Sequence, residues 1–358
     1  MLKARPNQSD YPRSHTDRVP GRTSLAGRLT ASLETKAWLN VELTNVCDLH
    51  CPLCITGTGR NPEPQGFMDF DAYRTWLRAV APRVEAVRFL GNGEPTLHPR
   101  FLDFIAETAA LGLPVQVGTN GMHLPPAKAL LASGLSALYL DVDGVTPEQH
   151  SLYRRGAELT HILSSAKSLA AARPGRRPEL YFLTLLGRHN EEQRPQFLEL
   201  ARTTGMDGIV FQLLADEFYA QEGQTSSRWF GRRHERLAEQ DCVWRSSLGM
   251  LNWRGELQLC QMGPYKQGCF TKHHAFANPD PLVTLHSAEF RDLTNRCGSF
   301  PFCRGCQCRS FERLSETVLF SKRLFLRKGL EKLLRNPGVY LLPSRLFSML
   351  RQYRWDRS

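Results

Sequence analysis

Three cysteines near the start of the chain are spaced to hold a metal group. Cys47, Cys51 and Cys54 follow one another as C-x3-C-x2-C within one short segment. Three thiolates on a single loop can bind three corners of a cubane iron–sulfur cluster and leave the fourth iron open. An open iron is needed by a cluster that binds a substrate as well as carrying electrons. The triplet therefore predicts a reactive [4Fe–4S] centre.

Two other interpretations of this triplet stay open, a zinc site and buried free thiols. Zinc in a structural site takes four protein ligands, most often as paired cysteines or histidines. Neither a fourth cysteine nor a paired histidine lies near the triplet, and His50 inside the loop is expected to point away from its neighbours. The spacing favours the iron–sulfur cluster.

The elements that must position this loop alternate between strands and helices. Strand-like apolar runs cover Ala37–Leu43, Ala86–Leu90, Pro114–Gly118, Ala137–Asp141, Leu180–Leu186 and Gly208–Leu213. Helical patterns between them include Asp71–Val80, Phe101–Leu111, Pro126–Ala132 and Glu191–Thr203. Six such units predict an α/β fold with a parallel sheet and right-handed crossovers. Six are too few for a complete eight-stranded barrel, so we expect an open, partial (β/α)6 barrel with its functional loops after the strands.

The cysteine loop after the first strand resembles the radical S-adenosylmethionine (SAM) superfamily, which is defined by this C-x3-C-x2-C motif. A second likeness follows the second strand, where Gly91-Asn92-Gly93-Glu94-Pro95 resembles the GGEP element of that family. The resemblance implies that Gly91, Gly93, Glu94 and Pro95 form a backbone ledge for the methionyl amino group of SAM. Taken alone, the same residues would be an ordinary turn at the end of a strand.

Further likenesses follow the later strands. Thr119-Asn120-Gly121 is similar to the TNG turn of the family, and Leu140-Asp141-Val142-Asp143-Gly144 is similar to its S-x-D-G region, with Asp141 in place of serine. The resemblance implies that Asn120 and Asp143 contact SAM. It also implies that Arg155, rather than Arg154, meets the SAM carboxylate, and that Gln212 lies at the adenosine end. A solvated arginine on a helix is the alternative for Arg155.

A second set of cysteines lies towards the C-terminus. The spacing Cys242-x12-Gly255-x4-Cys260 is followed by Cys303-x2-Cys306, and Gly255 suggests a tight hairpin turn. This arrangement resembles the shortened SPASM domain called a twitch domain, which implies an auxiliary [4Fe–4S] cluster on Cys242, Cys260, Cys303 and Cys306. A structural zinc knuckle is the alternative. Three cysteines are not assigned to either cluster, namely Cys269, Cys297 and Cys308. In related epimerases a free thiol returns a hydrogen atom to the substrate radical, so these three are candidate catalytic residues. The alternative is that each is a small buried apolar residue.

Composition limits the classes of function. The 358 residues include ten cysteines without an export signal, which indicates metal ligands rather than disulfides and a cytoplasmic protein. The net charge of +11 is carried by the two ends, because residues 1–36 carry +4 and residues 310–358 carry +7. The body is therefore neutral, and no nucleic-acid surface is expected on it.

The family resemblance implies an enzyme that reductively cleaves SAM to a 5′-deoxyadenosyl radical, which takes a hydrogen atom from a substrate. A small polar substrate, such as a sugar or aminocyclitol that is dehydrogenated or epimerised, is favoured because only 36 residues precede the barrel. Modification of a peptide is an alternative. A non-catalytic, zinc-stabilised binding module with basic arms is another. Flavodoxin or ferredoxin is the expected electron donor.

The predicted organisation has four parts. Residues 1–36 form a flexible basic segment, 37–217 the radical SAM core, 240–310 the auxiliary-cluster domain and 316–358 basic C-terminal helices. Helical patterns cover 316–335 and 344–354, and a shared apolar face would present Leu319, Leu326, Leu330, Leu333 and Leu334. Such a helix predicts peripheral contact with the inner face of a membrane. Packing of the same leucines back onto the barrel is the alternative.

Overall fold

The computed structural model describes residues 37–214, 247–258, 270–277, 287–295, 315–321, 323–324, 326–328 and 353–355. The first of these ranges holds all six predicted β/α units. The cysteine triplet and the motifs after the strands lie within it. The predicted N-terminal segment 1–36 lies outside the described residues.

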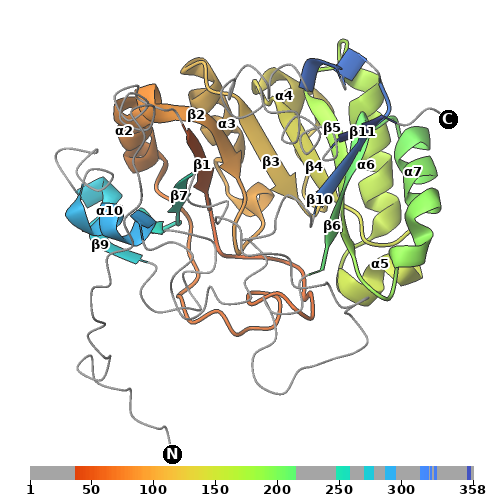
Figure 1. The fold of residues 1–358 in the computed structure, drawn as a ribbon, viewed down its shortest axis with the longest axis horizontal. Helices are drawn as coiled ribbons and strands as arrows, with labels where there is room; N and C mark the ends of the chain where they lie inside the picture. The colour runs from red at the N-terminus through yellow and green to blue at the C-terminus, as the bar shows by residue number, and fades with distance from the viewer. Residues whose placement is uncertain are drawn as a thin grey trace, which may run out of the picture. The chain divides into compact units, whose positions relative to one another are not determined.

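Six parallel strands form the body of the sheet (Figure 1). They run in the order in which they occur in the chain, and each pairs with the next in parallel. Their bounds are β1 (Ala37–Val41), β2 (Val84–Phe89), β3 (Val115–Thr119), β4 (Ala137–Asp141), β5 (Glu179–Leu186) and β6 (Gly208–Leu213). The sheet does not close on itself, so the predicted open α/β architecture is confirmed.

Helices connect these strands. They are α2 (Phe70–Val80), α3 (Phe101–Ala110), α4 (Ala127–Ala132), α5 (Pro147–Tyr153), α6 (Leu159–Ala172) and α7 (Arg194–Thr203). Single 3-10 turns lie at Ala81–Arg83, Pro95–Leu97 and Glu191–Gln193. The start of α2 shows how the sequence sets such a boundary, because the Asp69 carboxylate accepts the Ala72 N–H at 2.7 Å as an N-cap.

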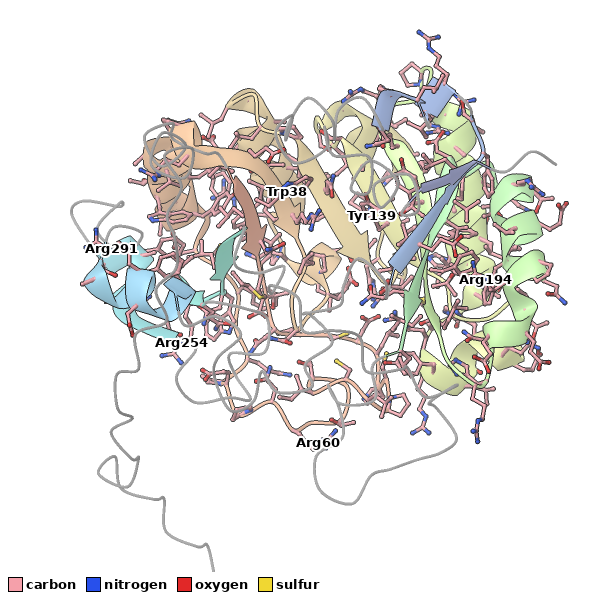
Figure 2. All side chains as sticks on the ribbon, viewed as in Figure 1. Trp38, Arg60, Tyr139, Arg194, Arg254 and Arg291 are labelled. Atoms are coloured by element: carbon pink, nitrogen blue, oxygen red, sulfur yellow. The ribbon has the colours of Figure 1, made fainter. Side chains whose placement is uncertain are left out.

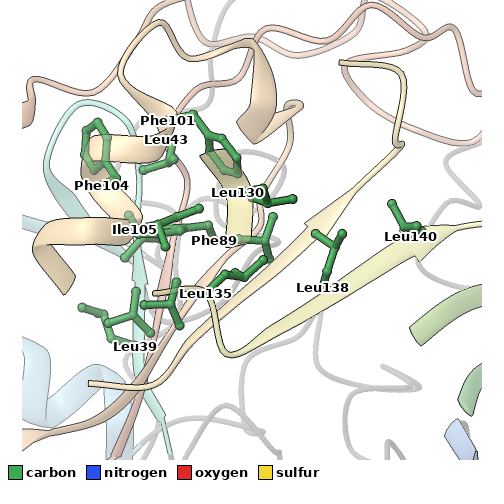
Figure 3. Packing of buried hydrophobic residues seen from close by; sticks show 14 of the residues in the cluster. Leu39, Leu43, Phe89, Phe101, Phe104, Ile105, Leu130, Leu135, Leu138 and Leu140 are labelled. Carbon is green, nitrogen blue, oxygen red and sulfur yellow. The ribbon is translucent and has the colours of Figure 1, made fainter. Parts of the chain in front are cut away.

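Alternate strand residues pack against the helices in one large core (Figure 3). Val87 and Phe89 of β2 and Leu138 and Leu140 of β4 are fully buried there with Phe104 of α3. Successive side chains of a strand point to opposite faces of the sheet. The residues between them, such as Arg88, therefore point to the opposite face, which we call the inner face.

The sheet extends beyond these six strands at both edges. Next to β1 lie β7 (Ser247–Leu251), β8 (Glu256–Gln258) and β9 (Phe270–His274), with β7 parallel to β1 and the other two pairs antiparallel. A 3-10 turn (Ala275–Ala277) and α10 (Ala288–Asn295) follow. Gly255 takes φ +80° in the turn between β7 and β8, so the predicted hairpin is confirmed.

The C-terminal prediction of helices is wrong at two strands, although residues 323–324 and 326–328 are helical as predicted. Residues Ser315–Leu319 form β10, which pairs antiparallel with β6, and Tyr353–Trp355 form β11, which pairs with β10. Helical periodicity was misleading because the edge of β6 offers unpaired backbone groups that a strand satisfies. Leu319 is fully buried there instead of lying on an amphipathic helix face.

Packing onto the sheet continues after β10. Leu324 is buried with Leu319 and Tyr181, and the Lys328 ammonium lies 2.8 Å from the Glu179 carboxylate. The alternative of packing back onto the barrel therefore holds for Leu319 and Leu324, whereas Leu326 is 58% exposed. Leu330, Leu333 and Leu334 lie outside the described residues. No described helix is both long enough and apolar enough to cross a bilayer.

Candidate active site at the cysteine loop

The three cysteines lie on the loop that leaves β1. Cys51 is buried, whereas Cys47 and Cys54 are half-buried, and all three pack in one small cluster with Leu49 and Leu53. Burial raises the pKa of Cys47 to about 12 and the pKa of Cys51 to about 11. Such thiols are mostly protonated at neutral pH, so they are poor free nucleophiles. A bound metal group would stabilise their thiolates.

The donor set on this loop is made of three thiols that share one small cluster. In the described part of the chain, no three His, Cys, Asp or Glu side chains gather closely enough to hold one metal ion. A cubane cluster takes its thiolates at separate corners and needs only sulfur ligands. Three thiols on one loop are the residue types that such a cluster takes.

Glu94 connects three of the loops around the cysteines. Its backbone N–H donates to the Val46 carbonyl at 2.8 Å, next to the first cysteine. One carboxylate oxygen accepts from the Thr119 hydroxyl at 2.6 Å and from the Thr96 hydroxyl and N–H, and the other accepts the Asn120 N–H at 2.8 Å. The side chain is buried, and burial raises its pKa. Both oxygens of the predicted cofactor residue are thus engaged by the chain itself.

The two glycines of the GNGEP element allow close packing against the first strand and its loop. A side-chain carbon at Gly93 would lie 2.3 Å from the Thr44 carbonyl oxygen, and one at Gly91 would lie 2.6 Å from Cγ of Glu42. Glu42 in turn accepts the Asn92 N–H at 2.8 Å and the Asn92 side-chain N–H at 3.0 Å. We predicted glycines that let SAM approach; the structure adds that they let the cysteine loop approach.

The TNG turn reaches the cysteine loop through Asp48. The Asn120 side chain donates to one Asp48 carboxylate oxygen at 2.8 Å, and His123 Nε2 lies 3.2 Å from the other. Asn120 also accepts the Met122 N–H at 2.9 Å, and Gly121 takes φ +79°. Asn120 is thus fixed beside the cysteines, while Asp48 and His123 were not predicted.

A buried ion network lies behind the loop. Arg154 Nη1 lies 3.0 Å from Asp141, and its Nε donates to Asp143 at 2.6 Å. Asp143 is fully buried and accepts the Leu185 N–H at 2.6 Å, and its own N–H donates to Nδ1 of His150. Burial, opposed by Arg154, raises the pKa of Asp141 to about 7.

The other residues predicted to contact SAM have fewer contacts with the cysteine loop. The Arg155 side chain is exposed, and its carbonyl accepts the His50 N–H at 2.9 Å, while Arg154 is drawn into the ion network. Gln212 is half-buried near the end of β6, opposite Ser315 of β10. Pro95 is buried at the start of the 3-10 turn. Cys242, Cys260, Cys269, Cys297, Cys303, Cys306 and Cys308 all lie outside the described residues.

The tip of the β7–β8 hairpin contacts the segment that follows the cysteines. Trp253 packs on Gly66 so closely that a side-chain carbon there would lie 2.2 Å from the indole ring. Arg254, labelled in Figure 2, lies 2.7 Å from Glu63. The Asn45 side chain accepts the Gly66 N–H at 2.9 Å. Sequence reasoning missed this contact, because nothing local relates residues about 190 positions apart.

Family comparison agrees with this geometry. Residues 41–201 match the model of the radical SAM superfamily. This segment is a radical SAM domain. It begins at the end of β1 and extends into α7, so it includes the cysteine loop, Glu94 and the Arg154 network.

Two curated proteins illustrate the relationship. The chain is 27% identical over 318 residues to the tungsten-containing aldehyde ferredoxin oxidoreductase cofactor-modifying protein of Pyrococcus furiosus, covering 76% of this chain and 87% of that one. It is 31% identical over 205 residues to the PqqA peptide cyclase of Xanthomonas axonopodis pv. citri, covering 57% of this chain and 54% of the cyclase. The chain thus spans about half the length of the second relative.

A solved structure shows the same fold. SuiB of Streptococcus suis bound to the precursor peptide SuiA matches with a TM-score of 0.60 and 14% identity. The match covers 79% of this chain and 72% of SuiB. At this identity the likeness concerns the fold alone.

Proposed function

We propose that this protein holds a [4Fe–4S] cluster on Cys47, Cys51 and Cys54 and uses it to cleave SAM. The observation that carries the proposal is a single loop with three sulfurs, which is tied to the neighbouring loops by the Glu94 N–H on the Val46 carbonyl and by the Asn120 side chain on Asp48. When bound, the cluster and SAM supply a 5′-deoxyadenosyl radical that removes a hydrogen atom from the substrate. The chain's own part is to hold the loop still and to shield it from water.

Electrostatics around the loop support binding of a cationic cofactor. SAM carries a sulfonium and an ammonium group, and the carboxylates of Asp48 and Asp143 lie beside the cysteines with the partly ionised Asp141 and the cation of Arg154. We propose that Gly91, Gly93 and Pro95 with Asn120 border the SAM site. Arg155 and Gln212 stay predictions for its carboxylate and adenosine ends. Glu94 and Asp143 would act on SAM chiefly by fixing their neighbours, because their carboxylates are already hydrogen-bonded.

An auxiliary cluster belongs to the same proposal. Cys242 and Cys260 flank the β7–β8 hairpin in sequence, which supports a shared site for them with Cys303 and Cys306. With such a site, residues 240–310 would form a SPASM or twitch domain that follows the 37–217 core. A flavodoxin or ferredoxin would supply the electrons.

The substrate class has two candidates. A small polar molecule is our first proposal, and the relative with 87% coverage is named for modifying a cofactor. A peptide is the second, because the printed names of PqqA peptide cyclase and of SuiB with its precursor peptide specify peptides. Dehydrogenation and epimerisation are the reaction types proposed for the small molecule.

Iron analysis and SAM cleavage test the proposal together. Anaerobically reconstituted protein should hold roughly eight irons, as two cubanes. Changing Cys47, Cys51 and Cys54 together to Ala should remove about half of the iron and abolish 5′-deoxyadenosine formation. A triple variant that still forms 5′-deoxyadenosine would refute the assignment of the first cluster. If the protein holds zinc in place of the iron of the second cubane, only the auxiliary cluster is refuted.

A further inference from the structure

The β7–β8 hairpin is connected to the cysteine site in two ways, and the first involves Glu42. This residue directly follows β1, beside β7, and its backbone N–H donates to the Leu251 carbonyl of β7 at 2.9 Å (Figure 1). Its side chain is buried, and one carboxylate oxygen accepts both the backbone N–H and the side-chain N–H of Asn92, at 2.8 and 3.0 Å. A single buried carboxyl therefore lies between the hairpin and the GNGEP element.

Glu42 is closely enclosed by both neighbours. A side-chain carbon at Gly91 would lie 2.6 Å from Cγ of Glu42, so the GNGEP element packs directly on this side chain. Burial raises the pKa of its carboxyl to about 7, whereas hydrogen bonds from Asn92 and from the Trp253 backbone lower it. A buried acceptor of this kind keeps its donors in place, because its loss leaves their N–H groups without a partner.

The second connection involves Gly66, in the segment that follows the cysteines. The Trp253 ring packs on this glycine. The Gly66 N–H donates to the Asn45 side chain at 2.9 Å, and its carbonyl accepts the Thr44 hydroxyl at 2.6 Å. The same hydroxyl accepts the Val46 N–H at 3.0 Å, one residue before the first cysteine. The tip of the hairpin is thus connected to the base of the cysteine loop as well as to the GNGEP element.

The turn of the hairpin is itself held in one conformation by Asn252. The side-chain oxygen of this buried residue accepts the N–H groups of Arg254 and Glu256, at 3.1 and 2.9 Å. Its side-chain N–H donates to the Glu256 carboxylate at 2.8 Å. A buried polar network whose members are hydrogen-bonded to one another is rigid. A constraint at the tip of the hairpin therefore acts on the whole hairpin.

We propose that Glu42 is a positioning residue that couples the β7–β8 hairpin to the SAM site. Through Asn92 it fixes the GNGEP element, so SAM binding and docking of the hairpin depend on each other. Such a coupling is reciprocal: SAM stabilises the docked hairpin by the factor by which the docked hairpin strengthens SAM binding. The proposal deepens the proposed function, on which it rests for the identity of SAM as the ligand. Cys242 and Cys260 flank this hairpin in sequence.

SAM binding to the oxidised, reconstituted full-length chain tests the proposal without turnover. Glu42→Leu removes the acceptor of both Asn92 donors and should raise the Kd for SAM by about tenfold or more. Iron content should stay unchanged, because the bonds from Glu94 and Asn120 to the cysteine loop do not involve Glu42. Glu42→Gln should restore most of the affinity, since one amide oxygen can accept both Asn92 donors.

Amide hydrogen exchange, followed by mass spectrometry, measures the coupling itself. SAM should slow exchange in peptides that cover 250–257 of the wild-type hairpin, and Glu42→Leu should abolish this protection. Trp253→Ala should weaken SAM binding about fivefold or more. In the double variant the two losses should not add, because both substitutions act on one connection. Glu63→Gln is the matched control: it removes a half-exposed ion pair with Arg254 at the same hairpin tip, and should change the Kd by less than about twofold.

Each outcome decides the proposal. Weaker SAM binding with iron retained and hairpin protection lost supports the coupling. An equal Kd in wild type and Glu42→Leu overturns it, as does a parallel loss of iron and SAM, which would make Glu42 a general structural residue. If Glu42→Leu does not fold, an unchanged Kd and unchanged protection in Trp253→Ala overturn it instead. If the wild-type chain binds no SAM, the proposed function fails, and exchange at 90–94 in metal-free wild type and Glu42→Gln still shows whether Glu42 holds the GNGEP element.

Discussion

Replacement of Glu94 gives the sharpest test of how the site is built. Glu94→Gln keeps the size of the side chain and exchanges one oxygen for an amide. The amide nitrogen can face the hydroxyls of Thr96 and Thr119, which can turn to accept, while the remaining oxygen keeps the Asn120 N–H. Only the Thr96 N–H then loses its acceptor. Glu94→Ala, by contrast, removes the acceptor of both backbone N–H groups.

The expected losses of stability follow from the number of buried N–H donors that each substitution leaves without an acceptor. One donor left without a partner in a buried site costs about 1–3 kcal/mol, so Glu94→Gln should lower the free energy of unfolding by that amount. Two such donors make the loss in Glu94→Ala roughly 2–6 kcal/mol before any cavity is considered. The Glu94 side chain fixes Asn120, which donates to Asp48 in the cysteine loop, so the loop should loosen when the Asn120 N–H loses its acceptor.

Anaerobic urea unfolding of the metal-free chain measures the loss, and iron content after reconstitution measures the effect on the loop. Glu199→Ala is the control, because its carboxylate is two-thirds exposed in a pair with Arg202. That substitution should change stability by less than about 0.5 kcal/mol. If Glu94→Ala unfolds at the same urea concentration as Glu199→Ala and binds as much iron as wild type, Glu94 does not hold the loops together.

Two further substitutions and one deletion test other parts of the molecule. Arg154→Gln leaves the carboxylates of Asp141 and Asp143 buried without their cation, so urea unfolding should show a loss of about 3–5 kcal/mol at pH 8 and a smaller loss near pH 5; equal losses would contradict the ion network. Burial raises the pKa of Glu42 from 4.5 to about 7, so its contribution to stability is fully present below pH 4.5 and is lost as the pH rises through 7. The stability difference between wild type and Glu42→Gln should therefore shift by about 3 kcal/mol across that window, and a flat difference would place the carboxyl in contact with water. Deletion of 316–358 removes β10 from the edge of β6 and should give insoluble or unfolded protein rather than a soluble core; a soluble deletion that loses only its binding to anionic vesicles would support the membrane prediction instead.

Much of the core was predictable because its signals are local. The bounds of β4 and β6 agree with the prediction to the residue, since apolar runs bounded by turns mark buried parallel strands. The cysteine spacing likewise predicted a cluster loop directly after β1. The C-terminal prediction failed at Ser315–Leu319 for the opposite reason. Residues 316–319 fit a helix as well as a strand, and only the free edge of β6 decided between them.

The sequence by itself determined which chemistry this protein carries: three thiols on one loop, glycine-rich turns after the strands and six β/α units to bring them together. Tertiary structure decided which side chains hold that loop. Glu94 reaches Thr119, Arg154 rather than Arg155 joins Asp141 and Asp143, and Trp253 packs on Gly66. Arg88 and Trp38 also meet only across neighbouring strands. Each of these pairs depends on strand register and on close packing between distant segments, which no spacing along one chain encodes.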